Sequence, residues 1–241
     1  MLADGTIGEE ELRYLADLYA AEVRTSDDAI GSFLDGLAER GLLDSSIVAF
    51  LSDHGEAIGE HGWIGHGIFH EEILAVPLLI RFPGGEWAGR YSEPVEHIDL
   101  APTLLDRLGI PIPEGMQGAS LLPLLRGEPA ALAPDRMRVS QRAHGIGLSF
   151  ADAPGLRIYF RRTPSGPDHL EVFDLGADPS EEHNLAADPA SRETWMPRLE
   201  RYLEWTRSRV AEDRAFRVKG SGIQEEDKGM LRALGYLGEE E

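Results

Sequence analysis

Two short apolar runs constrain the fold more than any other feature of this chain. They occupy residues 47–51 and residues 76–82, and both are rich in residues that favour strands. Neither run alternates between apolar and polar positions, which is typical of strands in a parallel sheet whose two faces are covered by helices. The chain is therefore predicted to contain an α/β domain with a mostly parallel sheet and flanking helices.

Helical patterns stand on either side of these runs. Between residues 9 and 40, apolar residues recur mostly every three or four positions and fall on one stripe, and Gly41 follows as a C-cap. The members of this stripe are Leu12, Leu15, Tyr19, Val23, Ile30, Leu34 and Leu37. Residues 99–108 are predicted to form a second helix, with Asp99 as its N-cap and Gly109 at its end.

The pattern changes after a proline-rich stretch at residues 111–134. Short strand candidates separated by turn residues predict an antiparallel meander, and a helix is predicted at residues 189–214. The strand candidates are Met137–Arg142 and residues 147–150, 156–162 and 169–175. We therefore divide the chain into residues 1–130, an α/β part, and residues 131–241, an antiparallel sheet with a helix and a tail.

Composition excludes several classes of protein. The chain has no cysteine, so neither a disulfide scaffold nor a Cys-ligated zinc site is encoded in it. With 43 acidic and 23 basic residues its formal net charge is −20, which argues against nucleic acid and anionic membranes as partners. The longest apolar run, residues 73–80, is far shorter than the roughly 20 residues that span a bilayer. No signal peptide is visible at the N-terminus, and the localisation and oligomeric state stay open.

The segment after the first apolar run concentrates the side chains that carry chemistry. Ligands bind outside the carboxyl ends of strands in open α/β sheets, and Asp53 and His54 follow such an end. A carboxylate oxygen with an imidazole nitrogen suits Mn, Fe or Zn, whereas Ca prefers oxygen ligands, and further ligands must come from elsewhere. In the alternative interpretation, Asp53 caps the following turn and His54 is a hydrogen-bonded core residue.

Other histidines follow in the same glycine-rich segment. His66 is a candidate group for binding an anionic substrate or donating a proton near neutral pH, and its alternative is a loop histidine without a role. His61, His70 and His97 are expected to have no functional role. Trp63 is expected to pack within the loop rather than to serve as a stacking platform.

Residues 47–84 resemble the C-terminal half of a sulfatase of the alkaline phosphatase superfamily. They read IVAFLSDHGEAIGEHGWIGHGIFHEEILAVPLLIRFPG. Three later segments also resemble the family and occur in its order, namely EHIDLAPTLLDRLGIPIPEGMQGASLLPLL, VFDLGADPSEEHNLA and LRALGYLG. The resemblance covers about residues 14–238. It implies a partial alkaline-phosphatase-like sandwich over residues 1–130 and a small antiparallel α+β C-terminal subdomain.

The resemblance also implies roles for particular residues. Asp53 and His54 match two ligands of one divalent metal ion, calcium or manganese. His66 matches a catalytic and substrate-binding residue that contacts the sulfate or phosphate oxygens and the leaving oxygen. The Asp-His pair is similar to that of phosphonate monoester hydrolases and of a branch of bacterial sulfatases.

The chain departs from the family pattern at the nucleophile. The family uses a formylglycine made from Cys or Ser in Cys/Ser-x-Pro/Ala-x-Arg. There is no cysteine, and the Ser-x-Pro or Ser-x-Ala sites at Ser92, Ser149 and Ser165 lack the arginine. The family's N-terminal Asp pair does not precede the long helix; Asp27 and Asp28 lie inside it. The chain alone is therefore expected to be inactive, as a truncated sequence, a partial gene model or a decayed paralogue.

The function implied by the resemblance is metal-dependent hydrolysis of a sulfate ester, with a sugar or other small-molecule sulfate ester as the substrate. Two alternatives stay open. One is a phosphonate or phosphate ester hydrolase on the same fold, which the Asp-His pair supports. The other is a non-catalytic remnant, which the missing nucleophile supports.

Overall fold

The fold is described from a computed structural model of the 241-residue chain. The structure describes residues 7–128, 132–142, 145–161 and 169–213. The chain divides into two compact units, Met1–Trp195 and Met196–Glu241. The boundary predicted between residues 130 and 131 lies within the first unit and stays a prediction. The C-terminal segment LRALGYLG lies outside the described residues.

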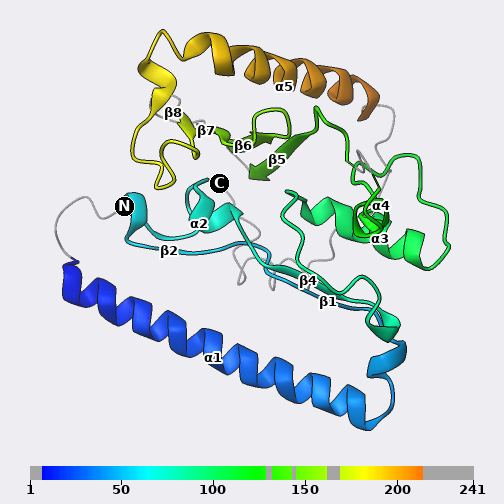
Figure 1. The fold of residues 1–241 in the computed structure, drawn as a ribbon. Coiled ribbons are helices and arrows are strands. Elements are labelled where there is room, and N and C mark those ends of the chain that lie inside the picture. The colour runs from blue at the N-terminus through cyan, green and yellow to red at the C-terminus, as the bar shows by residue number, and fades with distance from the viewer. Residues whose placement is uncertain (1–6, 129–131, 143–144, 162–168, 214–241) are drawn as a thin grey trace, which may run out of the picture. The chain divides into compact units, whose positions relative to one another are not determined.

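Helices and strands are interspersed along the first half of the chain, and four strands follow one another in the second (Figure 1). The helices are α1 (Glu9–Glu39), α2 (Glu71–Leu74), α3 (Leu100–Arg107), α4 (Leu122–Leu125) and α5 (Arg192–Asp213). The strands are β1 (Val48–Leu51), β2 (Ala57–Ile58), β3 (Ile64–Gly65), β4 (Leu78–Arg81), β5 (Met137–Arg142), β6 (Gly145–Phe150), β7 (Leu156–Arg161) and β8 (His169–Asp174). Among the described helices, none has the length and hydropathy needed to cross a membrane.

The predicted helices and strands are confirmed in type and order, but the direction of one strand pair is wrong. β1 and β4 pair antiparallel, with Val48 opposite Arg81 and Leu51 opposite Leu78, and every strand pair in the described ranges is antiparallel. Parallel neighbours need a crossover, usually a helix. The connection from β1 to β4 contains only the β2–β3 hairpin and the four-residue α2, which are too short to form a crossover. The chain therefore enters β4 next to the C-terminal end of β1, and the two strands run antiparallel.

The predicted meander is confirmed as a four-stranded sheet in the order β5-β6-β7-β8. Directly opposed residues share a face, and Leu148, Ile158 and Val172 form one such row with exposed fractions of 1% or less. The opposite face presents Tyr159 and Phe173, which pack around Phe69. This second face therefore holds the loop between β3 and α2.

Asp99 differs from its predicted role. It stands at the N-terminal cap position of α3, but its carboxylate does not cap that helix. The side chain is fully buried and accepts hydrogen bonds from the backbone N–H of Ala119, at 2.9 Å, and from Arg136, at 2.7 Å. Burial lowers the pKa of the Arg136 guanidinium, but the hydrogen bond and charge of Asp99 outweigh it and raise this pKa. The pair joins α3 to the segment before β5.

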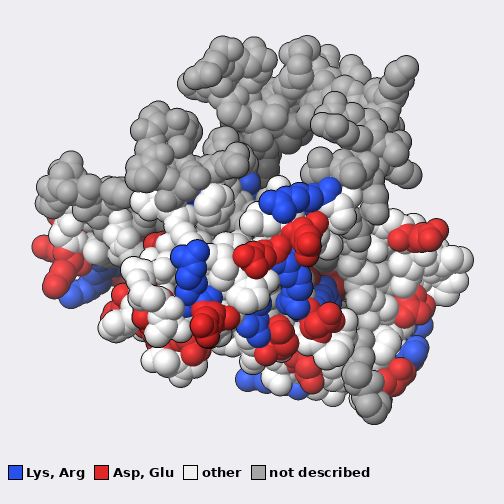
Figure 2. All heavy atoms as spheres, turned by 90° about the horizontal axis from the view of Figure 1, so that it is seen from above, with Lys and Arg blue, Asp and Glu red and all other residues white. Residues whose placement is uncertain are grey.

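The N-terminal elements carry exposed apolar side chains. No residue of α1 is buried, and Tyr14 and Phe33 are 64% and 63% exposed. On the β1–β4 pair, Phe50 lies directly opposite Leu79, and both are exposed. The expectation that both faces of these strands are covered is therefore not met within the described residues. On the face seen in Figure 2, acidic and basic side chains are interspersed over the described residues.

We expect the isolated chain to self-associate, because contiguous exposed apolar surface and open strand edges favour association. Size-exclusion chromatography with light scattering should show species larger than a monomer, and thermal unfolding should be broad. A monodisperse monomer with one sharp cooperative transition would contradict this prediction.

Candidate active site

The turn after β1 is held tightly against the end of α2. The backbone N–H of Gly55 donates to the carbonyl of Ile73 at 2.9 Å. A Cβ atom at Gly55 would lie 1.9 Å from the backbone oxygen of Glu72, so only glycine fits this close approach. His97 Nε2 lies 2.8 Å from the carbonyl of Ser52. His97 thus makes a hydrogen bond that fixes the end of β1, outside the set of candidate catalytic groups.

The side chains of Asp53 and His54 are oriented so that one possible ligand atom of each lies near the other. His54 Nδ1 lies 3.0 Å from the carbonyl of Gly55, and because a carbonyl only accepts, we assign the proton to Nδ1. Nε2 then carries the free lone pair, and it lies 3.7 Å from Asp53 Oδ2. The other oxygen of Asp53 accepts the backbone N–H of His54 at 3.0 Å. One imidazole nitrogen and one carboxylate oxygen can therefore converge on one divalent ion.

His66 is held by a carboxylate that the sequence analysis did not single out. Its Nδ1 lies 2.8 Å from Glu56 Oε1, so Nδ1 carries a proton and Nε2 is left for a substrate. The His66 ring lies against the His54 ring, with 4.1 Å between centroids. The backbone oxygen of His66 accepts a hydrogen bond from Arg142 at 3.0 Å. The His66 side chain is 56% exposed, which leaves it accessible.

His54, Glu56 and His66 also lie close enough to hold an ion among themselves. The nitrogen of His54 that faces Glu56 is Nδ1, at 3.9 Å, and it is engaged with the carbonyl of Gly55. A ligand to metal needs the unprotonated nitrogen, which is Nε2. The chemistry of the donor set therefore favours Asp53 with His54, and leaves Glu56 as the partner of His66.

A second polar cluster joins residues that are far apart in the sequence. Glu181 accepts hydrogen bonds from Tyr159, at 2.5 Å, and from the backbone N–H of Glu71, at 3.0 Å, and it lies 3.1 Å from His70 Nδ1. His61 stacks on His70, with centroids 3.6 Å apart and 11° between the planes. Nearly parallel rings direct their lone pairs side by side, and both Glu181 oxygens are engaged. Hydrogen bonds and ring stacking in this cluster therefore join the loop after β2, the start of α2, β7 and the segment after β8.

The outcome for His61 and His70 is thus mixed. Neither faces Asp53 or His54 in any contact described above, and the expectation that they have no functional role stays a prediction. His70 nevertheless holds Glu181 to the start of α2, a role that its sequence position did not indicate. Glu181 belongs to the segment VFDLGADPSEEHNLA, so its resemblance to the family was the available signal.

Burial raises the pKa of the Glu181 carboxyl, but hydrogen bonds from His70, Tyr159 and the Glu71 backbone outweigh it and hold this pKa below its ordinary value of 4.5. A carboxyl with a lowered folded-state pKa stabilises the fold above its unfolded pKa, and the stabilisation is lost as pH falls through the folded value. Tyr159→Phe should therefore lower the free energy of unfolding by about 1–3 kcal/mol at pH 7, and by less in acid.

Urea unfolding at pH 7 and at pH 4 measures this difference. Tyr19→Phe is the control, because Tyr19 is exposed on α1 and should change stability little at either pH. An equal loss in Tyr159→Phe at both pH values would show that the hydroxyl acts independently of the Glu181 charge.

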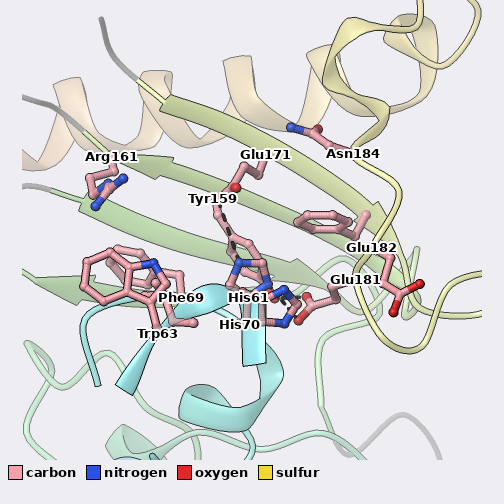
Figure 3. A pocket seen from close by; sticks show the side chains of 12 residues that line it. His61, Trp63, Phe69, His70, Tyr159, Arg161, Glu171, Glu181, Glu182 and Asn184 are labelled. Carbon is pink, nitrogen blue, oxygen red and sulfur yellow. Dashed lines mark hydrogen bonds and ion pairs between the residues drawn. The ribbon is translucent and has the colours of Figure 1, made fainter. Parts of the chain in front are cut away.

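A cavity of about 400 Å³ opens beside this cluster (Figure 3). Its walls come from the loop between β2 and β3, the loop between β3 and α2, strands β7 and β8, and the segment after β8. The lining residues are His61, Trp63, Ile68, Phe69, His70, Tyr159, Arg161, Glu171, Phe173, Glu181, Glu182 and Asn184. Trp63 also packs on the backbone at Gly67, where a Cβ atom would lie 2.6 Å from the ring. The expected packing role of Trp63 is therefore present, and the same ring borders the cavity.

The chain is similar in sequence to known proteins. A family model described as Sulfatase matches residues 4–110. The chain is 34% identical over 185 residues to an N-acetylglucosamine-6-O-sulfatase of Bacteroides thetaiotaomicron, covering 72% of this chain and 32% of that protein. It is 31% identical over 219 residues to the multifunctional alkaline phosphatase superfamily protein PehA of Trinickia caryophylli, covering 83% and 42% respectively.

Solved structures give the same relationship. One is a complex of a protein with its substrate D-glucosamine-2-N,6-O-disulfate, with a TM-score of 0.62 and 28% identity, covering 79% of this chain and 40% of that one. Another is a phosphonate monoester hydrolase from Silicibacter pomeroyi, with a TM-score of 0.70 and 26% identity, covering 87% and 44%.

The fold is that of the alkaline phosphatase superfamily. Within that superfamily, the chain belongs to the sulfatase family. It spans 32% and 42% of the lengths of the two curated relatives named above.

Proposed function

We propose that this chain supplies part of the active site of a sulfate-ester hydrolase. Asp53 and His54 hold one divalent metal ion, calcium or manganese, and His66 contacts the substrate. The single observation that carries the proposal is the orientation of the His54 ring, whose Nδ1 lies 3.0 Å from the Gly55 carbonyl oxygen and whose Nε2 lies 3.7 Å from Asp53 Oδ2. Orientation of a metal-binding histidine by a backbone carbonyl is a common feature of metal sites.

The metal ion, when bound, supplies positive charge for the oxygens of the sulfate group. His66 acts on the substrate rather than on the metal ion. Its Nδ1–H is fixed by Glu56, so its Nε2 is directed outward. In the doubly protonated ring, Nε2–H can donate to the leaving oxygen, and the Glu56 carboxylate stabilises the positive charge of that ring.

The nucleophile is not among these residues. A formylglycine would need a cysteine or serine in the family motif, and the residues of this chain do not fit that group. We therefore assign no nucleophilic step to this chain, and we infer that on its own it does not turn over sulfate esters. The assignment of residues 1–130 to the C-terminal part of the sulfatase α/β domain belongs to this proposal.

A sugar sulfate is the substrate that the comparisons support. The N-acetylglucosamine-6-O-sulfatase and the complex with D-glucosamine-2-N,6-O-disulfate are both relatives by sequence and structure. A second candidate is hydrolysis of phosphonate or phosphate esters. The specific observation in its favour is the likeness to the phosphonate monoester hydrolase of Silicibacter pomeroyi.

The test uses a chain extended at its N-terminus to the length of the relatives and loaded with Mn²⁺ or Ca²⁺. We expect faster turnover of N-acetylglucosamine 6-sulfate and of an aryl sulfate than of an aryl phosphonate monoester. Faster turnover of the phosphonate would establish the second candidate instead. No turnover of any of these esters would leave the chain as a non-catalytic remnant.

A further inference from the structure

His70 is a buried histidine with one free ring nitrogen. Its side chain is 5% exposed, and its Nδ1 lies 3.1 Å from Glu181 Oε2. An ionised carboxylate only accepts hydrogen bonds, so we assign the ring proton to Nδ1. Nε2 then carries the lone pair, and it has no hydrogen-bond partner among the described residues. A buried acceptor without a partner is rare, because it has lost its contact with water and gained nothing in return.

This free nitrogen faces a carboxylate. Nε2 lies 3.9 Å from Glu171 Oε2, so the His70 ring stands between Glu171 and Glu181 (Figure 3). The register of the meander brings Glu171 there, because Glu171 on β8 is directly opposite Tyr159 on β7. A proton on Nε2 would not join the two groups, because 3.9 Å is longer than a hydrogen bond. A larger cation that binds both atoms fits this gap.

Glu181 orients the ring in the way that is typical of metal-binding histidines. Such a histidine usually donates its other N–H to a carboxylate, which fixes the ring and makes the free nitrogen a stronger ligand. Both Glu181 oxygens are fixed in turn, one by the Tyr159 hydroxyl and the other by the backbone N–H of Glu71. His61 stacks on His70 and holds the plane of its ring. Glu181 is therefore a positioning residue, and His70 Nε2 is the ligand atom.

The charge of the cavity favours a cation. Its charged lining residues are Glu171, Glu181, Glu182 and Arg161. Arg161 lies over the Trp63 ring, at the end of the cavity away from Glu182 (Figure 3). In the part of the chain that the structure describes, neither Glu171 nor Glu182 forms an ion pair with a lysine or an arginine. Like charges that share a cavity repel, and a bound cation relieves this repulsion.

The donor atoms favour a transition-metal ion. An imidazole nitrogen with a carboxylate oxygen suits zinc, whereas calcium prefers a shell of oxygens. Two ligand atoms of one zinc ion lie about 3–4 Å apart, because each is about 2 Å from the metal. The distance of 3.9 Å between His70 Nε2 and Glu171 Oε2 is in this range, and the Glu171 side chain is 42% exposed, which leaves it room to adjust.

We propose that His70 Nε2 and the Glu171 carboxylate bind a zinc ion in this cavity, with water in the remaining positions of the ion. The ion joins β8 to the start of α2 and thereby stabilises the contact between the meander and the loop that precedes α2. The site shares no ligand with the pair Asp53 and His54. It is independent of the proposed function.

Zinc binding is measured on the full 241-residue chain in a background without the candidate active site. Asp53→Ala, His54→Ala and His66→Ala together give this background, so that zinc held by those side chains does not contribute. Competition with a chromophoric zinc indicator at neutral pH gives the affinity and tolerates self-association. We expect zinc to bind, and calcium to bind at least about tenfold more weakly.

Glu171→Gln in this background should weaken zinc binding by at least about tenfold, since even groups outside the ligand set contribute about 10–100-fold. His70→Gln should weaken it as much, because its amide can donate to Glu181 but offers no imidazole nitrogen. Glu22→Gln is the control, because it removes the same charge from the exposed surface of α1 and should bind zinc like the background chain. Zinc should also raise the urea midpoint of the background chain more than that of Glu171→Gln.

Three results would overturn the proposal: no zinc binding in the background chain, equal zinc affinity in the background chain and Glu171→Gln, or calcium bound as tightly as zinc. If His70→Gln does not fold, Glu171→Gln decides, because the Glu171 side chain makes no hydrogen bond within the described residues. An extended chain without sulfatase activity would refute the proposed function and leave this site standing.

Discussion

Replacing Gly55 by alanine is expected to lower the free energy of unfolding by more than about 3 kcal/mol. The new Cβ atom would lie 1.9 Å from the backbone oxygen of Glu72, and neither group is a flexible side chain that can rotate away. The turn must move, which breaks the hydrogen bond from Gly55 N–H to the Ile73 carbonyl. His54 would lose the orientation that the Gly55 carbonyl gives it, so metal binding should fall as well.

Gly31→Ala is the matched control for this change. Gly31 lies inside α1, and a Cβ atom there meets nothing within 4 Å. Alanine is the better helix former, so this variant should be more stable by about 0.5–1 kcal/mol. Urea unfolding of both variants beside the wild type gives the two values. A Gly55→Ala variant as stable as the wild type would show that the close approach to Glu72 is not required.

The second large effect concerns the proposed metal ligands, Asp53 and His54, in a chain extended to the length of the relatives. Asp53→Ala removes a charged ligand, and we expect metal affinity to fall by more than about 100-fold, since even partners outside the ligand set contribute 10–100-fold. His54→Asn should be milder and should shift preference from manganese toward calcium, because an amide oxygen is a harder ligand than an imidazole nitrogen.

Titration with Mn²⁺ and Ca²⁺ separates these variants. Glu60→Ala is a suitable control, because Glu60 is an exposed carboxylate of the same loop whose hydrogen bond goes to the backbone N–H of Ile58. It should bind both ions as the wild type does. A Glu60→Ala variant that loses metal together with Asp53→Ala would indicate damage to the loop rather than loss of a ligand.

The periodicity of apolar residues was sufficient to predict those helices and strands that are determined by their local sequence. It predicted α1, α3, α5 and the four strands of the meander, because turns and helix ends there carry their own signals. It was wrong about the direction of β4, because direction depends on the whole connection between two strands. That connection has no helix able to carry the chain to the other end of β1.

The candidate site residues were chosen from their sequence positions and from the family resemblance, and their roles stay predictions. Asp53, His54 and His66 were identified by position and resemblance, whereas Glu56 and Glu181 were not singled out. Glu56 meets His66 across a hairpin, and Glu181 meets His70 from a segment 111 residues away. Such contacts depend on tertiary packing, and a single sequence shows no periodic signal for them.

The stripe of α1 illustrates the same limit. Its apolar residues recur as in a helix that packs on a core, yet none is buried. Helical periodicity predicts that a helix has an apolar face, but it does not predict what packs on that face.

The central claim is that Asp53 and His54 act on a metal ion while His66 acts on the substrate. This claim is tested by comparing His66→Ala with Asp53→Ala in the extended chain. For each variant, the metal content is measured by elemental analysis and the turnover of an aryl sulfate is measured in parallel. We predict that His66→Ala keeps the metal content of the wild type and loses about 10²–10⁴-fold in kcat, whereas Asp53→Ala loses both metal and turnover. If His66→Ala loses the metal while Asp53→Ala keeps it, the assignment of roles is wrong.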